Sequence, residues 1–481
     1  MATEEFALTS AQEMTPDAID RYEGTRDKIA GVLLGAAVAD ALGWPTEFVK
    51  TSKQAEQLFK VSEVRDFVPW EKRTGGRFNT YIDYIQPGEY SDDTQLTLCT
   101  ARCILPDGTF DAERFSKKEL RHWPDYARGA GGTVTRAAKA IGRRDASWDN
   151  NFFAFQSRGR SSEYVNAGAN GGAMRVAPHA LANIFDESAA LRGIWRNVVI
   201  THGHPRALWG ALLYGKCLLV LLNWRRGSLE TFIDNLSLFV QDLDLSALDG
   251  GMEGWLARWR DHAHRSFEEA FDETRREVLD TLTVIHSART QPLRETYKAL
   301  GCFEPATKGS GTGTVAAAIA LFVRHGGNYE HAVLNAINMY GSDTDTIGAM
   351  VGAMAGALKG QMAIPDRWVN VMQDYGYFAR ATEAMTRISV REAVSNDLEV
   401  TKEREEAERQ DRDIVTLAKG RQVYKGQRVT HPLLGMGWVI DAHAQQIRRR
   451  DGGTMLLARV GFDVGQSCIF RSYQSSRTKD R

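Results

Sequence analysis

The chain has 481 residues, with 60 Lys and Arg against 61 Asp and Glu, so its formal net charge is −1. This balance excludes a strongly basic nucleic-acid coat protein, and a hydrophobic content of 43% excludes global disorder. The small net charge is an average over two unlike parts. Residues 421–481 contain eleven basic and four acidic residues, a balance of +7, which leaves −8 for residues 1–420 and suggests two modules.

From residue 21 to residue 395 the hydrophobic pattern is mostly helical, after a polar arm over residues 1–20. Periodicity near 3.6 residues predicts helices over residues 26–42, 93–105, 205–222, 266–287, 314–325 and 346–359. No strands alternate with crossover helices in this part, so we predict an all-α domain rather than a doubly wound α/β domain.

Small residues recur every four positions in two of the predicted helices. One helix carries Gly31, Gly35, Ala39 and Gly43, and the other carries a Gly ridge over residues 348–356. Such ridges let helix backbones approach closely, which would draw the loops at the helix ends together. Core packing alone is the alternative explanation.

The chain changes character after residue 395. Residues 396–420 predict a charged linker or exposed helix, since twelve of the seventeen residues in 397–413 are charged. Residues 421–481 then contain short β-rich runs at 426–431, 435–443, 454–462 and 467–473, separated by Gly, Pro and Asp. These runs predict a small basic β-barrel of four or five strands.

The cysteines and the N-terminus predict the cellular location. The five scattered cysteines form neither a disulfide framework nor a zinc-binding spacing. The first residues, MATEEFALTSAQEM, lack the basic and apolar segments of a signal peptide, and we expect no membrane span. We therefore expect a cytoplasmic protein.

Two acidic turns each precede an apolar helix. They are Ser91-Asp92-Asp93-Thr94 and Ser342-Asp343-Thr344-Asp345-Thr346. Either turn is typical of a helix N-cap with acidic residues in the first turn. Together they also offer the hard oxygen ligands that Mg²⁺ and Mn²⁺ prefer, in about the number that two metals require. The residues by themselves leave both interpretations open.

Two glycine-rich loops also lie before predicted helices, at residues 168–175 and 308–314. Free backbone N–H groups at such places bind phosphate or diphosphate, although a plain loop with a helix cap explains either loop alone. Neither loop fits the dinucleotide fingerprint or the P-loop. His202 and His204, followed by Arg206, offer further polar contacts to an anion.

In combination, these motifs resemble the ADP-ribosylglycohydrolase family. The matching segments are residues 31–48, 91–95, 170–178, 201–207 and 341–353, in the family's order. The resemblance implies an all-α domain of orthogonally packed helices with a binuclear Mg²⁺ or Mn²⁺ site. It also implies a hydrolase that removes ADP-ribose from a modified protein or nucleic acid, with ADP-ribosyl-arginine as one target. Countering an ADP-ribosyltransferase toxin fits this class.

The resemblance assigns roles to particular positions. The implied metal ligands are Ser91, where many members have Thr, and Asp92, Asp93, Asp343, Asp345 and Thr346. The implied catalytic carboxylates are Glu47, Asp92 and Asp345, with the choice between Glu47 and a metal-bound Asp as base left open. The implied substrate-binding residues are Gly131, Asn170, Gly171, Gly172, Met174, His202, Gly309, Ser310 and Gly311.

The C-terminal module resembles the Tudor-like small barrel (an SH3-like fold) that ends repair-type superfamily 1 helicases. The shared patterns are G-x-x-V-x-H at 426–431, G-x-G-x-V at 435–439 and V-x-F-D-x-G at 460–465. Its expected partner is a nucleic acid or a protein, or the module docks on the catalytic domain. Two alternatives to an active enzyme therefore remain: a catalytically reduced ADP-ribose-binding protein, and an adaptor that acts through the barrel.

Overall fold

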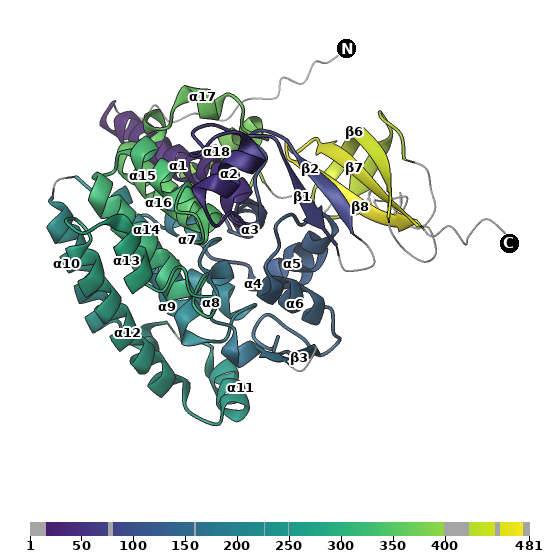
Figure 1. Cartoon of the computed structure of the whole chain (residues 1–481). Helices are drawn as coiled ribbons and strands as arrows, with labels where there is room; N and C mark the ends of the chain where they lie inside the picture. The colour runs from purple at the N-terminus through teal and green to yellow at the C-terminus, as the bar shows by residue number, and fades with distance from the viewer. Residues whose placement is uncertain are drawn as a thin grey trace, which may run out of the picture.

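A computed structural model of the chain describes residues 16–75, 80–157, 160–225, 227–248, 250–398, 423–447 and 453–474. Most of the predicted arm (1–20) and of the predicted linker (396–420) lies outside these residues. A helical body holds most of the chain, and a sheet of C-terminal strands lies at one side of it (Figure 1). The predicted combination of a helical domain and a small all-β part is confirmed.

All six predicted helices are present in the body. The predicted helix over 93–105 ends early, at Ala101, because the chain turns there and Leu105 N donates to Thr109 O (2.8 Å). The helices are α1 (Pro16–Gly43), α2 (Ser52–Phe59), α3 (Asp92–Ala101), α4 (Ala112–Arg114), α5 (Leu120–His122), α6 (Gly132–Ala140), α7 (Ala177–Ala182), α8 (Glu187–Val199), α9 (Pro205–Leu222), α10 (Leu229–Asp242), α11 (Glu253–Ala263), α12 (Phe267–Ser287), α13 (Leu293–Ala299), α14 (Gly311–His325), α15 (Tyr329–Ile337), α16 (Thr344–Lys359), α17 (Asp366–Val369) and α18 (Tyr375–Ser389).

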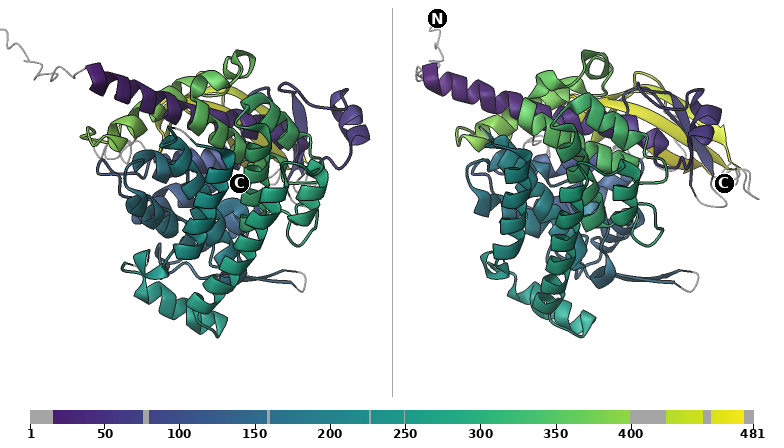
Figure 2. Two further views of the ribbon diagram at one scale, coloured as in Figure 1. Left: turned by 90° about the vertical axis from the view of Figure 1, so that its left-hand side faces the viewer. Right: turned by 60° about the vertical axis from the view of Figure 1, so that its left-hand side comes forward.

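Two antiparallel hairpins in the body were not predicted. They are β1 (Trp70–Thr74) with β2 (Tyr81–Ile85), and β3 (Ala154–Ser157) with β4 (Arg160–Glu163). The second hairpin projects from the body (Figure 2). The segment WEKRT is mostly charged and lacks the apolar alternation that identifies strands in a sequence.

The C-terminal strands pair antiparallel in the order β5-β6-β7-β8. They are β5 (Arg428–His431), β6 (Gly435–Gln446), β7 (Thr454–Phe462) and β8 (Ser467–Gln474). This arrangement is a small sheet, and the Tudor-like barrel is not confirmed.

The sheet packs directly on the helical body. Val439, Val460 and Phe470 belong to the same buried hydrophobic cluster as the helices. The Gln445 side chain accepts a hydrogen bond from Ile82 N (3.0 Å) and donates one to Ile82 O (2.7 Å), which joins β6 to β2. Arg459 pairs with Glu89 of the body. Among the described residues, the sheet is therefore part of one continuous core with the helices.

Two helical segments, residues 22–46 and Pro205–Leu222, are long and apolar enough to cross a membrane. Most of each segment is buried inside the structure. Packing in the protein core accounts for their apolar composition.

Helices α1 and α16 cross in backbone contact along their glycine ridges, and Figure 2 shows the long α1 beside the C-terminal helices of the body. A Cβ atom on Gly31 would lie 2.6 Å from Gly356 O, and one on Gly35 would lie 2.7 Å from Gly352 O. At the end of α1, a Cβ on Gly43 would lie 2.6 Å from Thr344 O. The ridges therefore bring the end of α1 against the start of α16. This agrees with the prediction that the small residues let the two backbones approach closely.

We expect Gly31→Ala to destabilise the protein by about 1–3 kcal/mol, because its methyl group overlaps the backbone of α16. The matched control is Gly24→Ala in the same helix, where no atom lies within 4 Å of the new Cβ. Alanine there should stabilise by up to about 1 kcal/mol. Urea unfolding measures both variants, and equal midpoints for the two would contradict the close crossing.

Candidate active site

The first acidic turn is fixed by a buried carboxylate of α1. Asp40 accepts hydrogen bonds from Ser91 N (3.1 Å), Thr94 N (3.2 Å) and Thr94 Oγ1 (2.6 Å). Ser91 caps α3, and its Oγ accepts from Asp93 N (3.2 Å). Because Asp40 satisfies the donors of this turn, the side chains of Asp92 and Asp93 remain available to face the cavity.

The second acidic turn starts α16. Asp343 is the N-cap residue, and Thr346 N donates to Asp345 Oδ1 (2.9 Å). The crossing of α1 and α16 places Glu47 beside this turn. One carboxylate oxygen from each of Glu47, Asp343 and Asp345 lies within 4.8 Å of the other two.

The glycine-rich loops meet the acidic turns through Asn170. Its Nδ2 donates to Asp343 Oδ2 (2.6 Å), and its backbone N donates to Gly309 O (2.9 Å). A third loop supports Asp92: Gly131 N lies 3.4 Å from Asp92 Oδ2 as a long hydrogen bond. Gly129 of this loop has φ +87°, and a Cβ there would lie 2.6 Å from Asp92 Oδ1, so only glycine fits.

These segments enclose a cavity of about 220 Å³. Most of the predicted site residues line it: Glu47, Asp92, Asp93, Gly131, Asn170, Gly171, Met174, His202, Gly309, Asp343, Asp345 and Thr346. Segments that are 250 positions apart in the sequence therefore form one site.

Four predicted residues lie elsewhere. Ser91 acts as the helix cap described above, and Ser310 lines an adjoining hollow. Gly172 packs against the Val198 side chain, since a Cβ on Gly172 would lie 3.0 Å from Val198 Cγ1. Gly311 lies at the crossing of α14 with α9, where a Cβ would lie 2.5 Å from Arg206 O, so its glycine serves helix packing.

Three residues near the site were missed in the sequence. Lys308 lines the cavity and its Nζ donates to Glu47 O (3.2 Å). Lys72 lies over the rings of Trp44 (4.9 Å) and Phe48 (4.8 Å), next to Glu47. Asp40 was the third, and its signal was a lone charged residue in the apolar last part of α1, residues 29–43.

The site concentrates buried and half-buried carboxylates around one cavity. Burial, with repulsion from Asp343, raises the pKa of Glu47 to about 8, while Lys72 opposes this rise. Burial also raises the pKa of Asp92 to about 7. The pKa values of Asp93 and Asp345 are well above the ordinary range, because of burial and then repulsion between the neighbouring carboxylates. Such a group is costly to hold together without compensating positive charge.

The donor set fits divalent cations. Asp93 Oδ2 is buried and has no hydrogen-bond partner among the described residues. The other donors are carboxylates and a hydroxyl, the hard ligands that Mg²⁺ and Mn²⁺ prefer. The residues of both acidic turns would therefore hold the metals.

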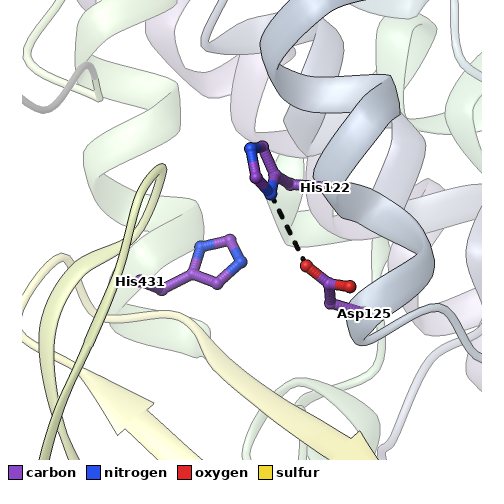
Figure 3. Close-up of side chains that lie close together, drawn as sticks. All are labelled: His122, Asp125 and His431. Carbon is purple, nitrogen blue, oxygen red and sulfur yellow. Dashed lines mark ion pairs between the residues drawn. The ribbon is translucent and has the colours of Figure 1, made fainter. Parts of the chain in front are cut away.

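A second group of potential ligands lies where β5 meets the body (Figure 3). His122, Asp125 and His431 each offer an atom within 4.8 Å of the others. His431 Nδ1 accepts a hydrogen bond from Leu433 N (3.3 Å), so the neutral ring carries its proton on Nε2. Nε2 faces the other two side chains, has no hydrogen-bond partner among the described residues, and cannot bind a metal while it carries the proton. We therefore assign this group to the interface between the sheet and the body.

Comparison with known proteins shows the family to which this chain belongs. The ADP-ribosylglycohydrolase family model matches residues 21–399. ADP-ribosylhydrolase ARH3 of Danio rerio is 30% identical over 357 residues, which is 71% of this chain and 85% of that protein. ADP-ribosylarginine hydrolase Tri1 of Serratia proteamaculans is 31% identical over 144 residues, which is 28% of this chain and 34% of Tri1. The chain belongs to the ADP-ribosylglycohydrolase family.

A solved structure shows the same fold. The ADP-ribosylglycohydrolase-related protein complex has a TM-score of 0.50 and 23% identity, covering 76% of this chain and 99% of that chain. The matches with three curated relatives span only 34% to 59% of those relatives' lengths.

Proposed function

We propose that the protein is a metal-dependent hydrolase that removes ADP-ribose from a modified arginine, or a related acceptor, of a protein. The main support is that two acidic turns and three glycine-rich loops line one cavity. The names of the relatives, ADP-ribosylarginine hydrolase and ADP-ribosylhydrolase, support this substrate class. The same reaction would reverse the action of an ADP-ribosyltransferase toxin.

Asp92, Asp93, Asp343, Asp345 and Thr346 would hold the metals. When bound, two Mg²⁺ or Mn²⁺ ions would supply positive charge that orients the ribose hydroxyls and a water. The chain itself keeps the ligands aligned, because Asn170 donates to Asp343 and the loop at Gly131 supports Asp92.

In the proposed reaction, the bond between the anomeric carbon and the acceptor nitrogen breaks, and its electron pair leaves on the nitrogen. The oxygen of water bonds to the carbon. Glu47 lines the cavity next to the second acidic turn and is therefore placed to exchange a proton with the water or the leaving nitrogen. The surrounding carboxylates would stabilise the positive charge that develops on the ring.

The test is an assay of released ADP-ribose. The substrates are ADP-ribosyl-arginine, a peptide modified on serine, and ADP-ribosylated DNA, each with and without Mg²⁺. We expect release from ADP-ribosyl-arginine that stops with a chelator and returns with added Mg²⁺ or Mn²⁺. No release from any of the three substrates would favour the ADP-ribose-binding alternative.

Metal binding should also be visible without catalysis. Because cations compensate the buried carboxylates, millimolar Mn²⁺ should raise the melting temperature of the chelator-treated protein by a few degrees. Thermal unfolding followed by fluorescence measures this shift. An unchanged melting temperature across the Mn²⁺ titration would contradict the proposed metal site.

A further inference from the structure

An apolar groove lies next to the cavity, on the other side of Glu47. It has a volume of about 600 Å³ and is formed by the segment after α1, by α2 and by β1. Apolar side chains that line it include Phe48, Leu58, Phe59, Pro69 and Trp70. We call this feature the acceptor groove.

The acceptor groove exposes large apolar side chains to solvent. Phe48 is 54% exposed and Leu58 is 58% exposed. The polar side chains of Gln54, Glu71 and Arg73 also line the groove. Exposed apolar surface with polar residues around it is typical of a binding surface.

The groove and the cavity share a wall. Glu47 lines the cavity, while the next residue, Phe48, lines the groove. Lys72 lines the groove, and its Nζ lies 4.8 Å from the centre of the Phe48 ring. A group that leaves the cavity past Glu47 therefore meets the groove.

The cavity also continues into a second, polar hollow. Beyond Thr133, Ala169 and Gly309 it continues into a polar hollow of about 340 Å³, which Arg206 and other polar residues line. A long, charged ADP-ribosyl group fits this polar direction. The bond to be cleaved would then lie at the acidic turns, with its acceptor on the side of Glu47 and the groove.

We propose that the acceptor groove binds the polypeptide that carries the ADP-ribose, through apolar side chains adjacent to the modified residue. This inference depends on the function proposed above, because the ADP-ribosyl group in the cavity tethers the polypeptide that the groove would bind. An extended peptide advances about 3.3 Å per residue, so side chains two or three positions from the modified residue reach a neighbouring groove. The mixed charges of Glu71, Lys72 and Arg73 favour a peptide over a phosphate backbone.

The test compares nine-residue peptides that carry ADP-ribosyl-arginine at the centre. One peptide has Leu at the positions two residues before and after the arginine, and the other has Ser there. We expect kcat/KM for wild-type protein to be about 10-fold higher with the Leu peptide, mainly through KM. Leu58→Ser should reduce this ratio to about 2.

The matched control is Leu238→Ser in α10, a leucine that is 54% exposed and does not line the groove. This variant should keep the wild-type ratio. Equal kcat/KM values for the two peptides would overturn the proposal of an acceptor groove, even if free ADP-ribosyl-arginine is hydrolysed. The same loss of the Leu-to-Ser peptide ratio in Leu58→Ser and Leu238→Ser would overturn it as well. Faster release from ADP-ribosylated DNA than from either peptide would indicate a nucleic-acid acceptor and would also overturn it. No release from any substrate would overturn the proposed function, and the groove with it.

Discussion

Asp345→Asn should lower kcat/KM for release of ADP-ribose on the order of 10³-fold or more, at any Mg²⁺ concentration. Asp345 is buried among the other carboxylates, and asparagine keeps its shape while removing the charge that a cation requires. Removing one of several repelling charges should leave the metal-free protein at least as stable as wild type. The double variant Asp92→Ala with Asp93→Ala should lose activity to the same extent.

The control for Asp345→Asn is Asp366→Asn, an exposed aspartate in the first turn of α17. Its activity should equal that of wild type. Circular dichroism and the Mn²⁺-dependent melting shift separate loss of metal binding from loss of fold. A helical Asp345→Asn protein with full activity would disprove the metal role of this turn.

Arg102→Met should destabilise the protein by about 3–5 kcal/mol, the largest stability effect that we expect. Arg102 and Glu119 form a buried ion pair of 2.8 Å, with side chains 1% and 0% exposed. Arg102 Nη1 also donates to Tyr377 OH (3.1 Å) and Gln466 Oε1 (2.8 Å), so this side chain links α3, α18 and the turn between β7 and β8. Its loss leaves the Glu119 carboxylate buried without a positive partner.

Two further variants show whether the isolated charge causes this loss. Arg102→Met combined with Glu119→Leu removes both charges and should recover most of the stability. Arg289→Met breaks an exposed pair with Glu230 and should cost at most about 1 kcal/mol. Urea unfolding gives the three values. A single Arg102→Met variant as stable as Arg289→Met would contradict the buried network.

The positions of the two acidic turns could be predicted from local signals, and the resemblance to the family then implied that their carboxylates are metal ligands. Asp92, Asp93, Asp343 and Asp345 each precede or start a helix that packs in the core, and the structure brings these residues into one cavity. The glycine ridges of α1 and α16 also indicated the contact that joins their ends. Gly311 shows the limit of this approach, since only packing decides whether a loop residue faces the cavity or a neighbouring helix.

By itself, the sequence determined the class of fold, the position of the acidic turns and the division into a helical part and a β-rich part. These properties depend on periodicity, capping residues and composition, which act over a few positions. Only the tertiary structure showed that Asp40 supports the first acidic turn, that Lys72 lies over the Phe48 ring next to Glu47, and that the C-terminal sheet shares its core with the helices. These contacts join residues far apart in the chain, and their partners become neighbours only when the helices pack.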